Sequence, residues 1–164
     1  MAELRNLDEK LGEVLGLAQA AKGATQKIGK LTEEDARRRL LDQMSEEAEE
    51  TARRCETVLD DAAFDGRKTA ILDQARETKQ EATEMMDTYL GDDADDLDGF
   101  EFLTMAEAGE VGHWSVLGKL NERAGDSRLQ ELVQWALPIQ QRHFEDVKAG
   151  SLKLAADEDP ASPA

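Results

Sequence analysis

Apolar residues recur at three- and four-residue spacing along most of the chain, which is the spacing of one face of an α-helix. In the first segment the pattern runs through Leu4, Leu7, Leu11 and Val14 and continues to Ile28. Four later segments show the same period, and short polar or glycine-containing stretches separate them. The pattern therefore predicts five helices, over residues 3–30, 32–61, from the turn at 64–66 to residue 90, 100–124 and 126–156.

The polar stretches predict where the helices begin and end. Thr32 precedes two glutamates and Asp35 in an order typical of a helix-starting capping box. Residues 91–99 hold five aspartates and predict a solvated acidic loop. We expect one helical bundle over residues 1–156, followed by a disordered acidic tail over residues 157–164.

Composition narrows the possible functions. The chain has 164 residues, of which 40% are apolar and only 4% aromatic, a mixture that favours helices. Asp and Glu number 37 against 20 Lys and Arg, a net charge of −17 that argues against binding nucleic acid or anionic membranes. No segment resembles a signal peptide or a membrane span. Cys55 is the single cysteine and is expected in the core, so a cytoplasmic protein is predicted.

Two similar helical turns carry the candidate chemistry. Glu110 precedes His113 by three residues, Gln140 precedes His143 by three, and an aromatic residue follows each histidine. These are the two histidines of the chain. Residues three apart lie on one side of a helix, so each pair can present an oxygen and an imidazole nitrogen to one point. Carboxylate-bridged metal sites inside helical bundles are built from this spacing.

Helical angles place these side chains on apolar faces. Glu110 is at the centre of the most apolar face of the fourth helix, with Glu107 and His113 about 60° to either side. Gln140 has the same position in the fifth helix, and His143 is again about 60° away.

The first two helices differ in what they offer the core. Glu47 lies at the edge of the apolar face of the second helix. In the first helix Glu9 and Glu13 lie nearly opposite the leucines, so this helix is expected to offer the core no carboxylate.

An unpaired buried carboxylate costs several kcal/mol, so the cluster needs partners. Three arrangements satisfy this requirement. The Glu and His side chains could bind a divalent metal pair, they could pair with one another without metal, or a small helix rotation could let the carboxylates reach water.

Three stretches of the sequence resemble the ferritin-like superfamily, most closely the bacterial stress-associated YciF-like branch. Residues 46–51 are similar to the second-helix run of that family, and residues 66–77 to its intermediate helix. Residues 107–117, continuing to Gly125, are similar to the run before its last helix. The resemblance implies an all-α fold, an antiparallel ferritin-like four-helix bundle with one accessory helix, usually paired as a homodimer, and a di-iron-type carboxylate site.

The chain departs from the family at the ligand positions. Met44 stands where a second-helix carboxylate is expected, Glu47 where a histidine is, and Gln140 where a last-helix glutamate is. The expected first-helix glutamate is not on the core face. A site of Glu47, Glu107, Glu110, His113, Gln140 and His143 is therefore compatible with two iron or manganese ions, with one, or with none.

Two functions follow as hypotheses. The first is a stress-associated protein that handles iron or manganese, with or without weak redox activity. The second is a metal-free helical bundle that serves as a non-enzymatic binding or assembly module. The expected partners are a divalent metal and a second copy of the chain, not nucleic acid or a membrane.

Overall fold

The computed structural model describes residues 3–163, and this part of the chain forms five α-helices and one 3-10 turn without any β-strand. The all-α prediction is confirmed. The elements are α1 (Asn6–Gly29), α2 (Asp35–Leu59), η1 (Ala62–Phe64), α3 (Lys68–Tyr89), α4 (Asp96–Ala124) and α5 (Ser127–Ala156).

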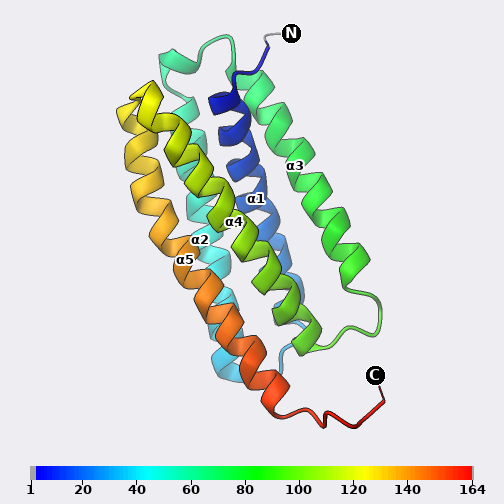
Figure 1. Ribbon diagram of the computed structural model, residues 1–164. Coiled ribbons are helices and arrows are strands. Elements are labelled where there is room, and N and C mark those ends of the chain that lie inside the picture. Colours follow the sequence, from blue (N-terminus) through cyan, green and yellow to red (C-terminus); the bar gives the residue numbers. More distant parts are fainter. Residues whose placement is uncertain (1–2, 164) are drawn as a thin grey trace.

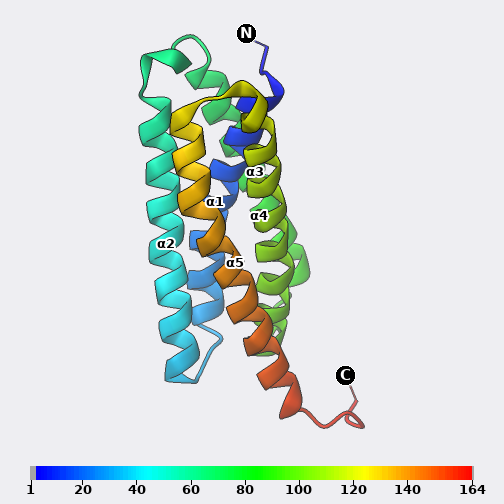
Figure 2. The ribbon, with the colours of Figure 1, turned by 60° about the vertical axis from the view of Figure 1, so that its left-hand side comes forward.

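The helices pack side by side as a bundle (Figure 1). α1 packs against α2, α3 and α4, and α5 packs against α4 and α2. The neighbours among α1, α2, α4 and α5 run in opposite directions, as both ribbon views show (Figure 2). α2 and α4 run the same way, and α3 crosses the length of the molecule to connect them.

Two glycines of α1 allow α3 to approach closely. A Cβ atom added at Gly16 would lie 2.4 Å from the carbonyl oxygen of Ala75, and one added at Gly12 would lie 2.8 Å from that of Ile71. Both distances are shorter than any normal contact with a carbon atom. The α1–α3 contact therefore depends on the absence of side chains at these positions.

The starts of α1, α2 and α4 differ from the predicted residues by three or four positions. α4 begins at Asp96 instead of residue 100, because Asp95 and Asp98 form a reciprocal capping box with two 3.0 Å hydrogen bonds. The acidic loop is shorter for the same reason. Thr32 does not cap α2; its hydroxyl donates to the carbonyl of Ile28, 3.0 Å away, and so satisfies the end of α1.

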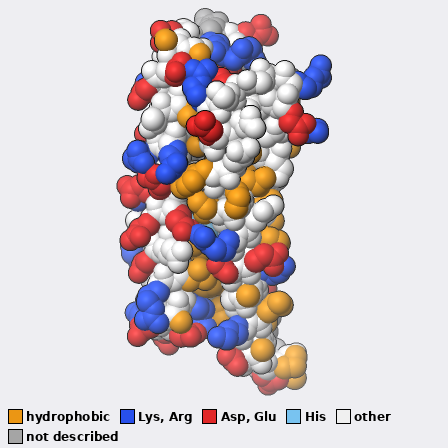
Figure 3. Space-filling model, turned by 90° about the vertical axis from the view of Figure 1, so that its left-hand side faces the viewer, with side chains coloured by type: hydrophobic (Ala, Val, Ile, Leu, Met, Phe, Trp, Pro, Cys, Tyr) orange, Lys and Arg blue, Asp and Glu red, His pale blue; other side chains and the backbone are white. Residues whose placement is uncertain are grey.

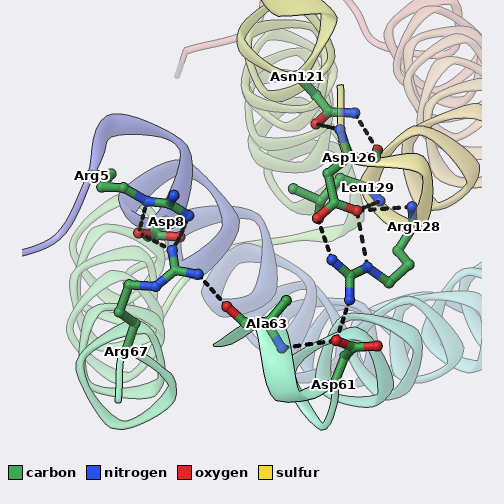
Figure 4. Close-up of polar contacts among 9 residues, drawn as sticks. All are labelled: Arg5, Asp8, Asp61, Ala63, Arg67, Asn121, Asp126, Arg128 and Leu129. Atoms are coloured by element: carbon green, nitrogen blue, oxygen red, sulfur yellow. Dashed lines mark hydrogen bonds and ion pairs between the residues drawn. The ribbon is translucent and has the colours of Figure 1, made fainter. Parts of the chain in front are cut away.

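A network of ion pairs closes one end of the bundle (Figure 4). Asp8, whose side chain is fully buried, pairs with Arg5 at 2.7 Å and with Arg67 at 2.6 Å. Arg128 pairs with Asp126 at 2.7 Å and also with Asp61. α1 therefore does bury a carboxylate, contrary to the prediction, although far from the candidate site and already paired.

The same end holds an aromatic ring between two cations. The guanidinium carbons of Arg67 and Arg128 lie 5.4 and 5.6 Å from the centre of the Phe64 ring. Such contacts add favourable electrostatic energy to ring burial. Phe64 thus connects the turn between α2 and α3 to the start of α5.

The apolar core consists of two clusters stacked along the bundle. One surrounds Trp114 and Leu15, and the other surrounds Phe100 and Met44. Cys55 is buried in the first cluster, as predicted, and burial raises the pKa of its thiol. Among the helices of residues 3–163, none has the length and hydrophobicity needed to cross a bilayer.

The predicted acidic tail is only partly described. Residues 157–163 are exposed beyond the end of α5, and their disorder stays a prediction. Residue 164 lies outside the described residues, as do residues 1 and 2 at the start of the predicted bundle.

Gly16→Ala should lower the free energy of unfolding by about 1–2 kcal/mol, although alanine is the better helix former, because the new methyl group meets the α3 backbone. Gly23→Ala is the matched control on the same helix, since its Cβ would meet no described atom within 4 Å. That control should gain about 0.5–1 kcal/mol. Urea denaturation of both variants measures the difference, and a Gly16→Ala protein as stable as Gly23→Ala would contradict the close helix approach.

Candidate functional site

A layer of buried polar side chains lies between the two apolar clusters. Glu107 and Glu110 come from α4, and Gln140 and His143 come from α5. Each is at most 3% exposed. The helical period explains the arrangement, because residues three apart in each helix point to the same side. Four of the six predicted site residues are therefore buried in the middle of the bundle.

His143 connects three helices. Its Nε2 lies 2.5 Å from Oε2 of Glu47 on α2, and its Nδ1 lies 3.5 Å from Oε2 of Glu107 on α4. The first is a short hydrogen-bond distance, and the second is a looser ion-pair distance. Arg142 also pairs with Glu47 at the surface. Glu47 therefore belongs to the site as predicted, at its partly exposed edge.

The imidazole of His143 and the carboxylate of Glu47 each stabilise the charged form of the other. Burial disfavours the imidazolium form, but the carboxylates of Glu107 and Glu47 outweigh that effect and raise the pKa of His143. Burial also opposes the charged form of Glu47, but contacts with Gln43, His143 and Arg142 lower its pKa. The pair is thus biased towards an imidazolium beside a carboxylate.

The carboxyl group of Glu110, in contrast, is biased towards its neutral form. Burial raises the pKa of its carboxyl group well above the ordinary value of 4.5, and the nearby charge of Glu107 raises it further. Within residues 3–163, no group forms a hydrogen bond with Oε2 of Glu110, Oε2 of Glu107 or Oε1 of Gln140. Three buried oxygens of the layer therefore lack a hydrogen-bond partner in the described part of the chain, as does the indole N–H of Trp114 one turn further along α4.

His113 does not join this layer. Its Nδ1 lies 3.0 Å from Oε2 of Glu13 and 3.2 Å from Nζ of Lys10, both on α1, and its side chain is 38% exposed. Glu13, predicted to lie nearly opposite the leucines of α1, nevertheless contacts α4. α4 and α3 both pack on α1, so a side chain away from the leucines still meets a neighbouring helix.

The structure also shows a groove that the sequence did not predict. It is lined by α1, α3 and α4, and its volume is ≈ 200 Å³. Glu107, Glu110 and His113 line it, and the rest of the lining is almost entirely apolar. The exposed methionines Met85 and Met105, also part of the lining, were the available sequence signal. Methionine commonly fills gaps in apolar cores, so the sequence did not show whether these two side chains are buried in the core or line a groove.

The donor set includes oxygen and imidazole groups that suit iron, manganese or zinc. Across residues 3–163, no three acidic, His or Cys side chains already converge in a metal-binding geometry. Both ring nitrogens of His143 face carboxylates, so coordination through this ring requires one of those contacts to open. Oε2 of Glu110 and Oε1 of Gln140 have no hydrogen-bond partner among the described residues, whereas Oε2 of Glu107 faces Nδ1 of His143 at 3.5 Å.

Comparison with known protein families finds no family that matches this sequence, and comparison with curated proteins finds no match either.

Glu110→Gln should stabilise the protein at alkaline pH and have little effect near pH 4. The folded state holds the Glu110 proton more tightly than the unfolded chain does. The stability due to this group is therefore fully present below about pH 4.5 and is lost as the pH rises towards the raised pKa. A glutamine removes this loss and can donate to Glu107, so the gain at pH 8 should be on the order of 1 kcal/mol.

The measurement is urea denaturation of both proteins from pH 4 to pH 8, with chelator present. Glu101→Gln is the matched control, because Glu101 lies exposed on the same helix. A pH-independent difference between Glu110→Gln and the parent protein would contradict a protonated Glu110.

Proposed function

We propose that the chain is a ferritin-like helical bundle whose central polar layer binds a divalent metal ion, with iron and manganese as the expected ions. The observation that carries the proposal is the set of buried oxygens that lack hydrogen-bond partners. Oxygens of Glu107, Glu110 and Gln140 have no hydrogen-bond donor among the described residues, and an imidazole lies beside them. A divalent cation would satisfy all of these groups together.

The chain connectivity supports the ferritin-like part of the proposal. A bundle in which two antiparallel helix pairs are joined by one long crossover is the arrangement of ferritin-like folds. Here α1–α2 and α4–α5 are the pairs, and α3 occupies the crossover. The resemblance of residues 46–51, 66–77 and 107–117 to the YciF-like branch points the same way.

The ligands favour one ion rather than two. His113 pairs with Glu13 outside the layer, which leaves one imidazole near the carboxylates. Met44 is apolar where a further carboxylate would be needed, and Gln140 supplies a neutral oxygen. Glu107, Glu110, Gln140 and His143 would hold the ion, and Glu47 would orient the imidazole.

Each residue has a definite task in this proposal. Glu110 must release its proton before it can coordinate, so metal uptake would release protons and weaken as the pH falls. Glu47 would accept a hydrogen bond from one ring nitrogen of His143 and leave the other for the ion, an arrangement common around metal-binding histidines. A bound iron or manganese ion would supply one-electron redox chemistry.

A second candidate function follows from a specific observation. Both ring nitrogens of His143 already face carboxylates, which is the arrangement of a self-sufficient ion-pair network. In that case the layer serves to fix the packing of α2, α4 and α5, and the bundle is a non-enzymatic binding or assembly module.

The two candidates differ in a calorimetric titration. Chelator-treated protein should bind Mn²⁺ or Fe²⁺ with about one ion per chain, and His143→Ala should weaken binding by about tenfold or more. His113→Ala is the matched control, because that histidine lies outside the layer. Absence of binding by Mn²⁺, Fe²⁺ and Zn²⁺ would refute the metal proposal and favour the network.

Gln140→Glu distinguishes the two candidate functions by adding a possible metal ligand instead of removing one. Without metal, a further carboxyl group buried beside Glu110 should lower the free energy of unfolding by about 1–3 kcal/mol. With Mn²⁺ the added anionic oxygen should tighten binding by roughly tenfold and reverse the loss. Thermal melts of this variant with and without Mn²⁺ measure both effects. A melting temperature that stays lowered when Mn²⁺ is added would count against a metal role.

A further inference from the structure

The groove between α1, α3 and α4 reaches the polar layer from the side away from α2 and α5. Its floor includes Glu107 and Glu110, which are 1% and 3% exposed. Its walls are apolar residues of the three helices, and Met85 and Met105 at its edge are 57% and 45% exposed. The opposite face, formed by α2 and α5, instead presents mixed acidic and basic side chains around a few apolar ones (Figure 3).

The ionisable groups that line the groove are two carboxyl groups and the imidazole of His113, which already pairs with Glu13. No described lysine or arginine contributes to the lining. One oxygen of each carboxyl group has no hydrogen-bond partner among residues 3–163, although both groups are almost completely buried. An apolar pocket with a few convergent polar groups at its base is the usual form of a small-molecule site.

We propose that this groove binds a small lipophilic amine, with its apolar body between α1, α3 and α4 and its ammonium group against Glu110 and Glu107. The ammonium group supplies a donor to Oε2 of Glu110, which has none among the described residues, and to Glu107, whose Oε2 has only the loose 3.5 Å contact with His143. The apolar walls take up the hydrocarbon part and exclude water, so the charge pair is stronger than it would be at the surface.

The size of the groove sets the size of the ligand. A volume of ≈ 200 Å³ exceeds the roughly 150 Å³ of a buried cavity that accepts one benzene ring. One aromatic ring or short alkyl chain with a terminal amine therefore fits. Anionic ligands are disfavoured by the two acids, and a neutral ligand leaves the carboxyl groups without their ion pair.

This inference does not depend on the metal proposal. It uses the apolar walls and the carboxyl groups of α4, and needs neither His143 nor Gln140. Binding is therefore measured in the presence of chelator, where a metal ion contributes nothing.

The test is calorimetry and ligand-observed NMR with benzylamine and its neutral counterpart benzyl alcohol, at pH 7.5 and with the full chain. Benzylamine should bind about tenfold or more tightly than benzyl alcohol. Glu110→Gln should remove most of that preference, while Glu101→Gln, exposed on the same helix, should keep it. Equal affinity for the two ligands, or no binding of benzylamine, would overturn the proposal.

A second pair of variants locates the ligand without changing any charge. Gly109 lines the groove and Gly112 does not, and an added Cβ meets no described atom within 4 Å at either position. Gly109→Leu should block the groove and weaken benzylamine binding by about tenfold or more, whereas Gly112→Leu should leave it unchanged. Equal effects of the two substitutions would overturn the proposed location.

Discussion

The burial of two carboxyl groups beside one imidazole is the constraint on which the middle of the molecule depends. Glu107 and Glu110 lie one turn apart on α4, and among residues 3–163 His143 is the one cationic group within ion-pair distance of Glu107. The imidazole is shared with Glu47, so the two acids cannot both be neutralised by it. Burial and the nearby charge of Glu107 therefore raise the pKa of Glu110 and favour its protonated form.

The other polar interactions discussed above hold the helices of the bundle in place and supply no hydrogen-bond partner to this layer. The end network around Asp8 and Arg128 pairs its charges fully, and the capping box at Asp95 satisfies the start of α4. The fully paired charges of this network contrast with the three oxygens of the central layer that lack partners among the described residues, although Nε of Arg37 near the start of α2 also lacks one. Unpaired buried groups are costly, and groups of this kind are concentrated at functional sites.

Much of the fold could be predicted from apolar spacing, because the helical period fixes which side chains share a face. Glu107, Glu110, Gln140 and His143 are buried for that reason. His113 was predicted in the polar layer but lies outside it. At about 60° from the centre of the apolar face, a side chain can point either into the core or towards a neighbouring helix, and the packing of the helices decides between them. The contacts of Asp8 and Glu13, and the groove itself, depend on how α3 and α4 pack against α1. The apolar period within one helix gives no information on that packing.

The crossover helix divides the chain into two helical hairpins, α1–α2 and α4–α5, whose internal contacts are local in sequence. Local contacts form fastest, so each hairpin can assemble early. The Glu47–His143 pair joins residues 96 apart and belongs to both hairpins. The contact between Glu47 and His143 therefore forms only when the two hairpins dock, whereas the other members of the polar layer already lie within the α4–α5 hairpin.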